Sequence, residues 1–110
     1  MLKKRNRLTR KEFAKVFHKG TPFIFTDFIV KYNSNTVPFS RFGVSVGLKI
    51  SKKAVERNAM RRHLYIALEE LIGTFAKGDY IILVRQKKDI PALKTSFFHA
   101  FNVISTRFNK

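Results

Sequence analysis

Residues 51–70 read SKKAVERNAMRRHLYIALEE and predict one long helix over about 51–72. We expect it to begin at Ser51, whose hydroxyl can cap free backbone N–H groups, and to end near Gly73. No glycine or proline interrupts the chain between these two residues. Two apolar stripes recur at helical spacing: Val55, Ala59 and Ile66 form one, and Met60, Leu64, Ala67 and Leu71 form the other. These stripes can anchor the helix on a core.

The first half of this helix is strongly basic. It carries Lys52, Lys53, Arg57, Arg61 and Arg62, opposed only by Glu56. At ~100° per residue, Arg57 lies beside Arg61, and Asn58 lies beside Arg62. Cations near the start of a helix also oppose its dipole, by ~0.3–1 kcal/mol. A negatively charged partner would offset this conflict, and phosphate is the natural candidate.

The composition narrows the class of protein. The chain has 110 residues, 45% of them hydrophobic, which is enough for one small folded domain. Its 23 Lys and Arg against 7 Asp and Glu give a net charge of +16, which calls for nucleic acid, an anionic membrane or an acidic protein as partner. The chain has no Cys for disulfides or thiolate chemistry, and no apolar run reaches the ~18 residues of a transmembrane helix. A cytoplasmic nucleic-acid-binding protein is therefore the leading class.

The chain divides into a short basic segment and one domain. We expect residues 1–9 to be flexible until they are bound, and residues 10–110 to form a single RNA-binding α/β domain. Phe13, Val16 and Phe17 recur at helical spacing and predict a short helix, with a cap at Thr9 and a stop at Gly20. Most of the twelve Phe should lie in the core, but this helix is too short and basic to be deeply buried.

Aromatic and β-branched residues over 21–32 predict two short strands, broken at Thr26 and Asp27. Residues 33–40 are rich in Asn, Ser and Pro, so a hairpin connection is expected there. In residues 41–50, apolar side chains alternate with small or charged ones. Phe42, Val44, Val46 and Leu48 share one face, and Arg41, Gly43, Ser45, Gly47 and Lys49 share the other. Another chain could approach the second face closely.

Residues 80–84 read YIILV, an apolar run typical of a strand buried on both faces, and the run ends at Arg85. Pro91 suits the first turn of a last helix. The apolar face of that helix holds Leu93, Phe97, Phe101 and Ile104. The expected order is α-β-β-β-α-β-α, which predicts an α/β sandwich of one sheet with helices packed against it.

The sequence offers few groups of residues that could form a catalytic site. The carboxylates are scattered except for Glu69 and Glu70, which as helix neighbours point ~100° apart. His18, His63 and His99 show no metal-ligand spacing. Neither of the glycine-rich phosphate-binding motifs, G-x-x-x-x-G-K-[ST] and G-x-G-x-x-G, occurs. These features argue against a self-sufficient enzyme. Arginine forks and exposed aromatic rings instead favour binding to phosphates and unpaired bases.

Residues 53–65 read KAVERNAMRRHLY and, together with Lys52 before them, resemble the signature helix of the protein subunit of bacterial ribonuclease P, K-x-A-x-x-R-N-R-x-K-R-x-x-R. The matching positions are Arg57, Asn58, Arg61 and Arg62. Ala59 and Tyr65 stand where the signature has arginines. Three further blocks resemble the family in the same order, at residues 7–20, 41–49 and 78–85.

The resemblance implies a role in the 5′ maturation of tRNA. In this family the RNA subunit performs the magnesium-dependent hydrolysis that removes the 5′ leader of precursor tRNA, and the protein is an accessory subunit without catalytic or metal-binding residues. The residues implied for binding the catalytic RNA are Lys52, Lys53, Arg57, Asn58, Arg61 and Arg62. Those implied for the leader, in a cleft between the first helix and the sheet, are Phe13, Phe17, Lys49 and Arg85. Lys31 and Tyr32 could line the same cleft, but the sequence leaves open which face of the sheet each side chain points to.

The family fold also implies a mixed central sheet with a left-handed β-α-β crossover, against the right-handed rule. Three other functions remain open. A general RNA-binding or ribosome-associated basic protein would bind RNA without regard to a precursor's leader. A stand-alone nuclease would cleave without an RNA subunit, although the chain lacks a carboxylate cluster. A membrane-attached protein would need an exposed apolar helix face, but we expect the apolar residues of the long helix in the core.

Overall fold

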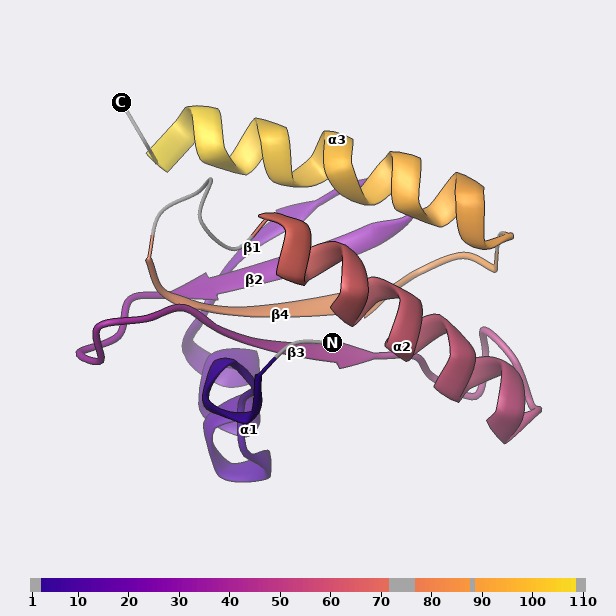
Figure 1. Ribbon diagram of the computed structural model, residues 1–110, viewed down its shortest axis with the longest axis horizontal. Coiled ribbons are helices and arrows are strands. Elements are labelled where there is room, and N and C mark those ends of the chain that lie inside the picture. Colours follow the sequence, from indigo (N-terminus) through magenta and orange to yellow (C-terminus); the bar gives the residue numbers. More distant parts are fainter. Residues whose placement is uncertain (1–2, 72–76, 88, 109–110) are drawn as a thin grey trace.

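A four-stranded mixed sheet organises the molecule (Figure 1). The computed structural model describes residues 3–71, 77–87 and 89–108. The strands are β1 (Thr21–Ile24), β2 (Phe28–Asn33), β3 (Arg41–Ser45) and β4 (Asp79–Val84), in the spatial order β1-β2-β4-β3. Neighbours in this order pair antiparallel, except that β3 and β4 are parallel.

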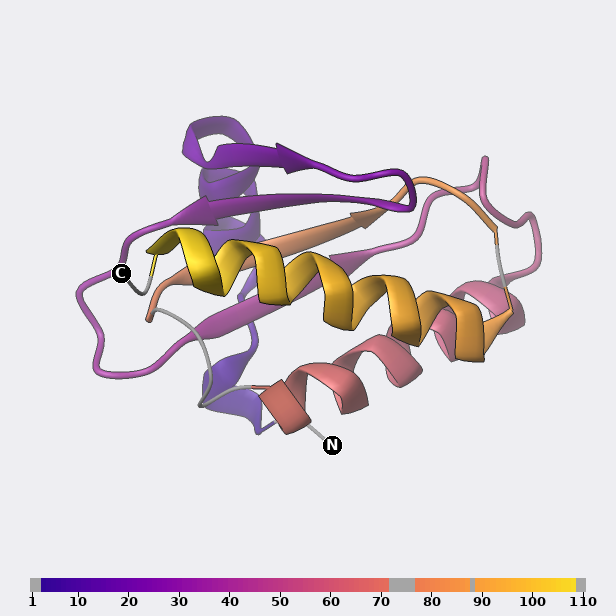
Figure 2. The same ribbon diagram turned by 90° about the horizontal axis from the view of Figure 1, so that it is seen from above.

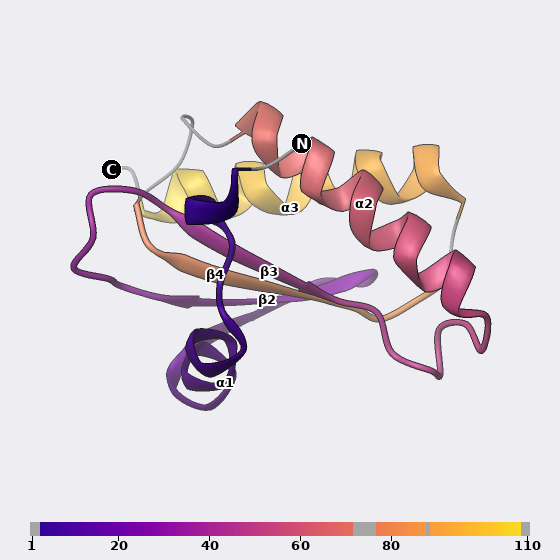
Figure 3. The same cartoon turned by 60° about the horizontal axis from the view of Figure 1, so that its bottom comes forward.

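Helices cover both faces of the sheet. They are the short 3-10 helix η1 (Lys4–Asn6) and the α-helices α1 (Arg10–Lys19), α2 (Ala54–Leu71) and α3 (Ile90–Phe108). α2 and α3 lie side by side on one face, and α1 lies on the other (Figure 3). The expected α/β sandwich and its order α-β-β-β-α-β-α are confirmed, with η1 added at the start.

The main core lies between the sheet and the layer formed by α2 and α3. The predicted apolar face of the last helix is confirmed, because its four residues are at most 1% exposed: Leu93, Phe97, Phe101 and Ile104. Tyr80 of β4 stacks on Phe42 of β3, with ring centroids 5.4 Å apart. Tyr80, Ile81 and Ile82 have no exposed surface, so β4 is a central strand buried on both faces, as predicted.

β3, α2 and β4 form a β-α-β unit whose crossover is left-handed. Seen from the helix-bearing side with both strands pointing up, β4 lies to the left of β3 (Figure 2). This hand departs from the right-handed rule for parallel strands. The unit also places β4 between β2 and β3. The hairpin expected at residues 33–40 is therefore wrong, because the strands on either side of this loop do not pair with each other.

α2 begins three residues later than predicted, at Ala54. The Ser51 hydroxyl accepts a hydrogen bond from the Lys53 N–H at 3.2 Å, so it caps a turn before the helix. Met60, Leu64 and Ala67 are buried, as predicted. Val55 and Ile66 are 80% and 37% exposed. The expectation that both apolar stripes enter the core is wrong, because α2 packs on β3 and α3 through one face. The expected stop at Gly73 lies outside the described residues.

α1 has the ends that the sequence predicts. Thr9 Oγ accepts a hydrogen bond from the Glu12 N–H at 3.2 Å, and Glu12 Oε1 accepts one from the Thr9 N–H at 2.8 Å. These reciprocal bonds form a capping box. Gly20 follows the last residue of the helix, and Val16 is 1% exposed against the sheet.

Two contacts fix α1 on the sheet. In the first, the Phe13 ring lies so close to β3 that a Cβ atom at Gly43 would be 2.5 Å from its Cδ2 atom. In the second, the Arg41 guanidinium donates two hydrogen bonds of 2.8 Å to the Asp79 carboxylate and a third to Glu12 of α1. The hydrogen bond with Asp79, more than the other nearby groups, raises the pKa of Arg41 above its ordinary value. The Arg41 side chain is only 18% exposed, so this ion pair is largely shielded from water.

Gly43→Ala should lower the free energy of unfolding by ~1–3 kcal/mol, because the added methyl group would collide with the Phe13 ring and displace α1. Gly47→Ala is the matched control, since no atom lies within 4 Å of the position that a Cβ would take there. Urea unfolding of both variants measures the difference. Equal stability of the two variants would show that α1 can move without cost.

Asp79→Asn should lower the free energy of unfolding by ~2–4 kcal/mol, because it leaves a largely buried guanidinium without its main counter-charge. Glu56→Gln removes one carboxylate charge from an exposed pair with Lys87 and should change stability much less. Thermal and urea unfolding at neutral pH compare the two variants. Similar losses in both would contradict the special role assigned to Asp79.

Candidate nucleic-acid interface

The start of α2 and the turn before it present the predicted cations to solvent. Six predicted residues lie there and are named the α2 basic surface: Lys52, Lys53, Arg57, Asn58, Arg61 and Arg62. Arg57 and Arg61 are half-buried, and the others are exposed. The Arg57 Nη1 group donates to the Ser51 carbonyl oxygen at 2.9 Å, and the Arg61 Nη2 group donates to Asn58 Oδ1. Neutral acceptors therefore orient the two half-buried arginines.

The charge of this surface is not neutralised by any ion pair with a carboxylate of the described residues. Glu56, which lies in the same turns of α2, pairs with Lys87 at an Nζ–Oε2 distance of 3.0 Å. The hydrogen bond from Lys87, ahead of the one from Ser51, lowers the pKa of Glu56. Guanidinium groups that lack a carboxylate can bind phosphate oxygens in a bidentate manner.

The second predicted surface lies on the face of the sheet that carries α1. Ile24, Ile29, Leu83 and Ser45 are paired side by side across β1, β2, β4 and β3, and we call this set the open row. Ile24 is 68% exposed and the other three are half-buried. Ile81, in the neighbouring row toward α1, is fully buried. α1 therefore covers only part of this face and leaves the open row accessible.

Phe13 and Phe17 of α1 have different surroundings. The Phe13 ring is half-buried against β3, whereas Phe17 is 41% exposed. Lys31 Nζ donates to the Phe17 carbonyl oxygen at 2.7 Å and lies 4.1 Å from the centroid of its ring, a cation–π contact. Tyr32 points the other way and contacts Tyr80 on the core side, with ring centroids 4.9 Å apart. Lys31, and not Tyr32, therefore lies beside the exposed ring.

Lys49 and Arg85 lie just beyond the carboxyl ends of the parallel strands β3 and β4, and both are exposed. Arg85 Nη1 donates to the carbonyl oxygen of Phe25, and its backbone N–H donates to that of Asp27, both at 2.8 Å. Lys49 lies in a turn because β3 ends before it, and for the same reason Leu48 is 67% exposed. Both predicted cations thus lie on the side of the open row toward the carboxyl ends of β3 and β4.

The open row is not evident from the sequence. β4 is apolar from Tyr80 to Val84, so its pattern does not separate the half-buried Leu83 from the fully buried Ile82. In β2 the burial alternates, but the sequence marks it only at Lys31, because Ile29 is as apolar as the buried Phe28 and Val30. Period-two alternation of residue type therefore does not identify the accessible face of either strand.

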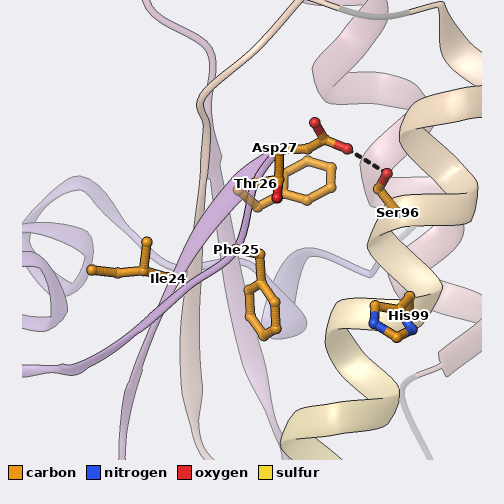
Figure 4. Close-up of a pocket in the computed structure, with 7 residues that line it drawn as sticks. Ile24, Phe25, Thr26, Asp27, Ser96 and His99 are labelled. Atoms are coloured by element: carbon orange, nitrogen blue, oxygen red, sulfur yellow. Dashed lines mark hydrogen bonds between the residues drawn. The ribbon is translucent and has the colours of Figure 1, made fainter.

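A pocket of about 520 Å³ lies between the β1–β2 turn and α3 (Figure 4). Its lining includes Asp27, Ser96 and His99, the residue types of a Ser-His-Asp site. The Ser96 hydroxyl, however, donates directly to the Asp27 carboxylate, and His99 lies apart from that bond. In a serine hydrolase the histidine lies between the other two residues. This pocket therefore provides no activated nucleophile.

Across residues 3–71, 77–87 and 89–108, no three His, Asp or Glu side chains gather closely enough to hold a metal ion. Within the same ranges, no helix has both the length and the apolar character needed to span a membrane.

The sequence matches a known family. The family described as Ribonuclease P matches residues 2–104. The ribonuclease P protein component of Pseudanabaena sp. (strain PCC 6903) is 38% identical over 86 residues, which cover 76% of this chain and 73% of that protein. The ribonuclease P protein component of Bacillus cereus (strain B4264) is 33% identical over 106 residues, which cover 91% of each chain.

Solved structures show the same fold. The RNase P protein of Staphylococcus aureus aligns with a TM-score of 0.82 at 21% identity, over 91% of this chain and 97% of that one. The RNase P protein from Thermotoga maritima aligns with a TM-score of 0.75 at 24% identity, over 91% and 96%. The fold expected from the resemblance is thereby confirmed, and the sequence matches establish the family. This chain belongs to the ribonuclease P protein family, the protein components of a tRNA-processing ribonucleoprotein endonuclease.

Proposed function

We propose that this chain binds the RNA subunit of ribonuclease P through the α2 basic surface and the 5′ leader of precursor tRNA on the α1 face of the sheet. The observation that carries the first part is the set of cations on α2 that no described carboxylate pairs with. The family signature falls on the same surface, at Arg57, Asn58, Arg61 and Arg62. RNA phosphates would supply the missing counter-charge and release bound counterions.

In this proposal the leader crosses the open row beside Phe17. The exposed ring of Phe17 can stack on an unpaired base, and Lys31, 4.1 Å from the ring centroid, can bind an adjacent phosphate. Lys49 and Arg85, which follow β3 and β4 in the chain, add positive charge along one side of the row. Phe13 offers the leader only part of its ring, because it also holds α1 against β3.

Magnesium serves the RNA subunit in this proposal, and the RNA subunit carries out hydrolysis. Several carboxylates of the protein are engaged in internal ion pairs: Glu12 and Asp79 bind Arg41, and Glu56 binds Lys87. The cytoplasmic location expected from the sequence stays a prediction.

The experiment that tests the proposal is cleavage of a precursor tRNA by a bacterial ribonuclease P RNA at low magnesium, with and without this protein. Stimulated cleavage at the mature 5′ end, with no cleavage by the protein alone, would support it. RNA binding without any change in cleavage would favour a general RNA-binding protein. Cleavage by the protein in the absence of the RNA subunit would favour a stand-alone nuclease.

Replacing both Arg57 and Arg61 by Ala should weaken binding to ribonuclease P RNA. The slope of log affinity against log salt concentration should fall by ~2, about one unit for each lost phosphate contact. Lys11→Ala with Lys94→Ala is the control, because it removes the same charge from α1 and α3. Filter binding over a series of salt concentrations measures both slopes. Equal losses in the two double variants would mean that net charge, rather than the α2 basic surface, drives binding.

Phe17→Ala should reduce affinity for precursor tRNA by ~1–3 kcal/mol in the complex with the RNA subunit, because it removes the proposed stacking surface. Affinity for mature tRNA, which lacks the leader, should not change. Val103→Ala on α3 is the control, since Val103 is 42% exposed, close to the 41% of Phe17. Equal losses for precursor and mature tRNA would contradict a leader contact at this residue.

A further inference from the structure

The basic segment before α1 lies along the outer edge of β3. Asn6 is 5% exposed, and its Nδ2 group donates to the Ser40 carbonyl oxygen at 2.8 Å. Arg7 pairs with Phe42 as a short parallel bridge, and the Leu8 N–H donates to the Phe42 carbonyl oxygen at 2.8 Å. Residues 6–8 are therefore held at defined positions beside α2. The expectation that residues 1–9 gain order only on binding stays a prediction.

The Arg7 side chain lies on an aromatic ring of α2. Its guanidinium carbon is 4.6 Å from the centroid of the Tyr65 ring. The Tyr65 hydroxyl oxygen accepts a hydrogen bond from the Val44 N–H at 3.2 Å, so the ring is tethered to the edge of β3. No carboxylate in the described part of the chain pairs with Arg7, and its Nε atom is buried without a hydrogen-bond partner there. The ring, and not an acidic group, therefore positions this cation.

The position of Tyr65 on α2 places the contact next to the α2 basic surface. Tyr65 follows Arg61 by four residues, as Arg61 follows Arg57, so the three lie in one row along the helix. A guanidinium stacked on Tyr65 therefore places a cation at the third position of a row whose first two positions are arginines. Stacking uses the flat face of the guanidinium and leaves N–H groups at its rim that can donate to a phosphate.

We propose that Arg7, held on Tyr65, is a phosphate-binding residue that extends the α2 basic surface onto the segment before α1. Its ligand is the phosphodiester backbone of the same RNA that α2 binds, so this inference rests on the proposed function. Tyr65 acts as a positioning residue, because it touches Arg7 and not the RNA.

Arg7→Ala should lower affinity for ribonuclease P RNA about five- to tenfold and reduce the salt slope by ~1. Arg5→Ala is the control, because it removes the same charge from the same segment. Arg5 lies over the Phe39 ring, at 5.5 Å, and away from the α2 row. It should lose clearly less affinity. Unchanged affinity in the Arg7 variant, or equal losses in both variants, would overturn the proposal.

Tyr65→Ala separates positioning from charge, because it removes no charge yet should reduce the salt slope as Arg7→Ala does. The double variant should then bind no more weakly than either single variant, since both remove one contact. Circular dichroism establishes that the variants are folded, and if Tyr65→Ala does not fold, the comparison of Arg7 with Arg5 decides alone. Additive losses, or an unchanged slope in folded Tyr65→Ala, would overturn the positioning role.

The Arg57 and Arg61 double variant, measured in the same assay, distinguishes failure of the role proposed for Arg7 from failure of the RNA-binding surface proposed for α2. A loss in that variant without a loss in Arg7→Ala would reject the role of Arg7 and leave the α2 basic surface in place. No loss in either would reject the proposed binding surface itself.

Discussion

The paired hydrogen bonds from Arg41 to Asp79 hold together the strands β3 and β4, on which both proposed surfaces depend. These two residues are paired at the first position of the β3–β4 ladder, and Arg41 also reaches Glu12 of α1. One guanidinium therefore fixes two parallel strands relative to each other and fixes α1 relative to both. A guanidinium that is shielded from water in this way stabilises the fold only while the carboxylates that pair with it are present. Because α1 is held at this end, it covers the neighbouring rows of the sheet and leaves the open row accessible.

The distribution of the few acidic residues explains how the molecule tolerates a net charge of +16. Glu12 and Asp79 neutralise Arg41, which is largely buried, and Glu56 pairs with Lys87 rather than with the arginines beside it. The counter-charge of Glu12 and Asp79 is thus placed where burial makes an unpaired cation costly. The cations of α2 stay at the surface, where water can solvate them until an anionic polymer replaces it.

Local patterns predicted most of the elements, because capping residues and apolar periodicity are properties of short segments. They failed where distant segments compete for the same edge: nothing in residues 33–40 reveals that β4 takes the place beside β2. The same limit applies to the surfaces. The α2 basic surface follows from residues close together in sequence, whereas the open row requires the register of four strands. The contact between Arg7 and Tyr65 joins residues 58 positions apart and has no local signal.

The central place of β4 in the sheet constrains how the protein can be made. A ribosome releases β2 and β3 before β4, and their facing edges must wait for residues 79–84 before either gains its partner. At ~5–20 residues per second, synthesis from the end of β3 to the end of β4 takes roughly 2–8 s. During that interval α1 and the β1–β2 hairpin can form from local contacts. Completion of the sheet is consequently a late event in synthesis, and a chain truncated before Asp79 would lack the middle of its sheet rather than an edge.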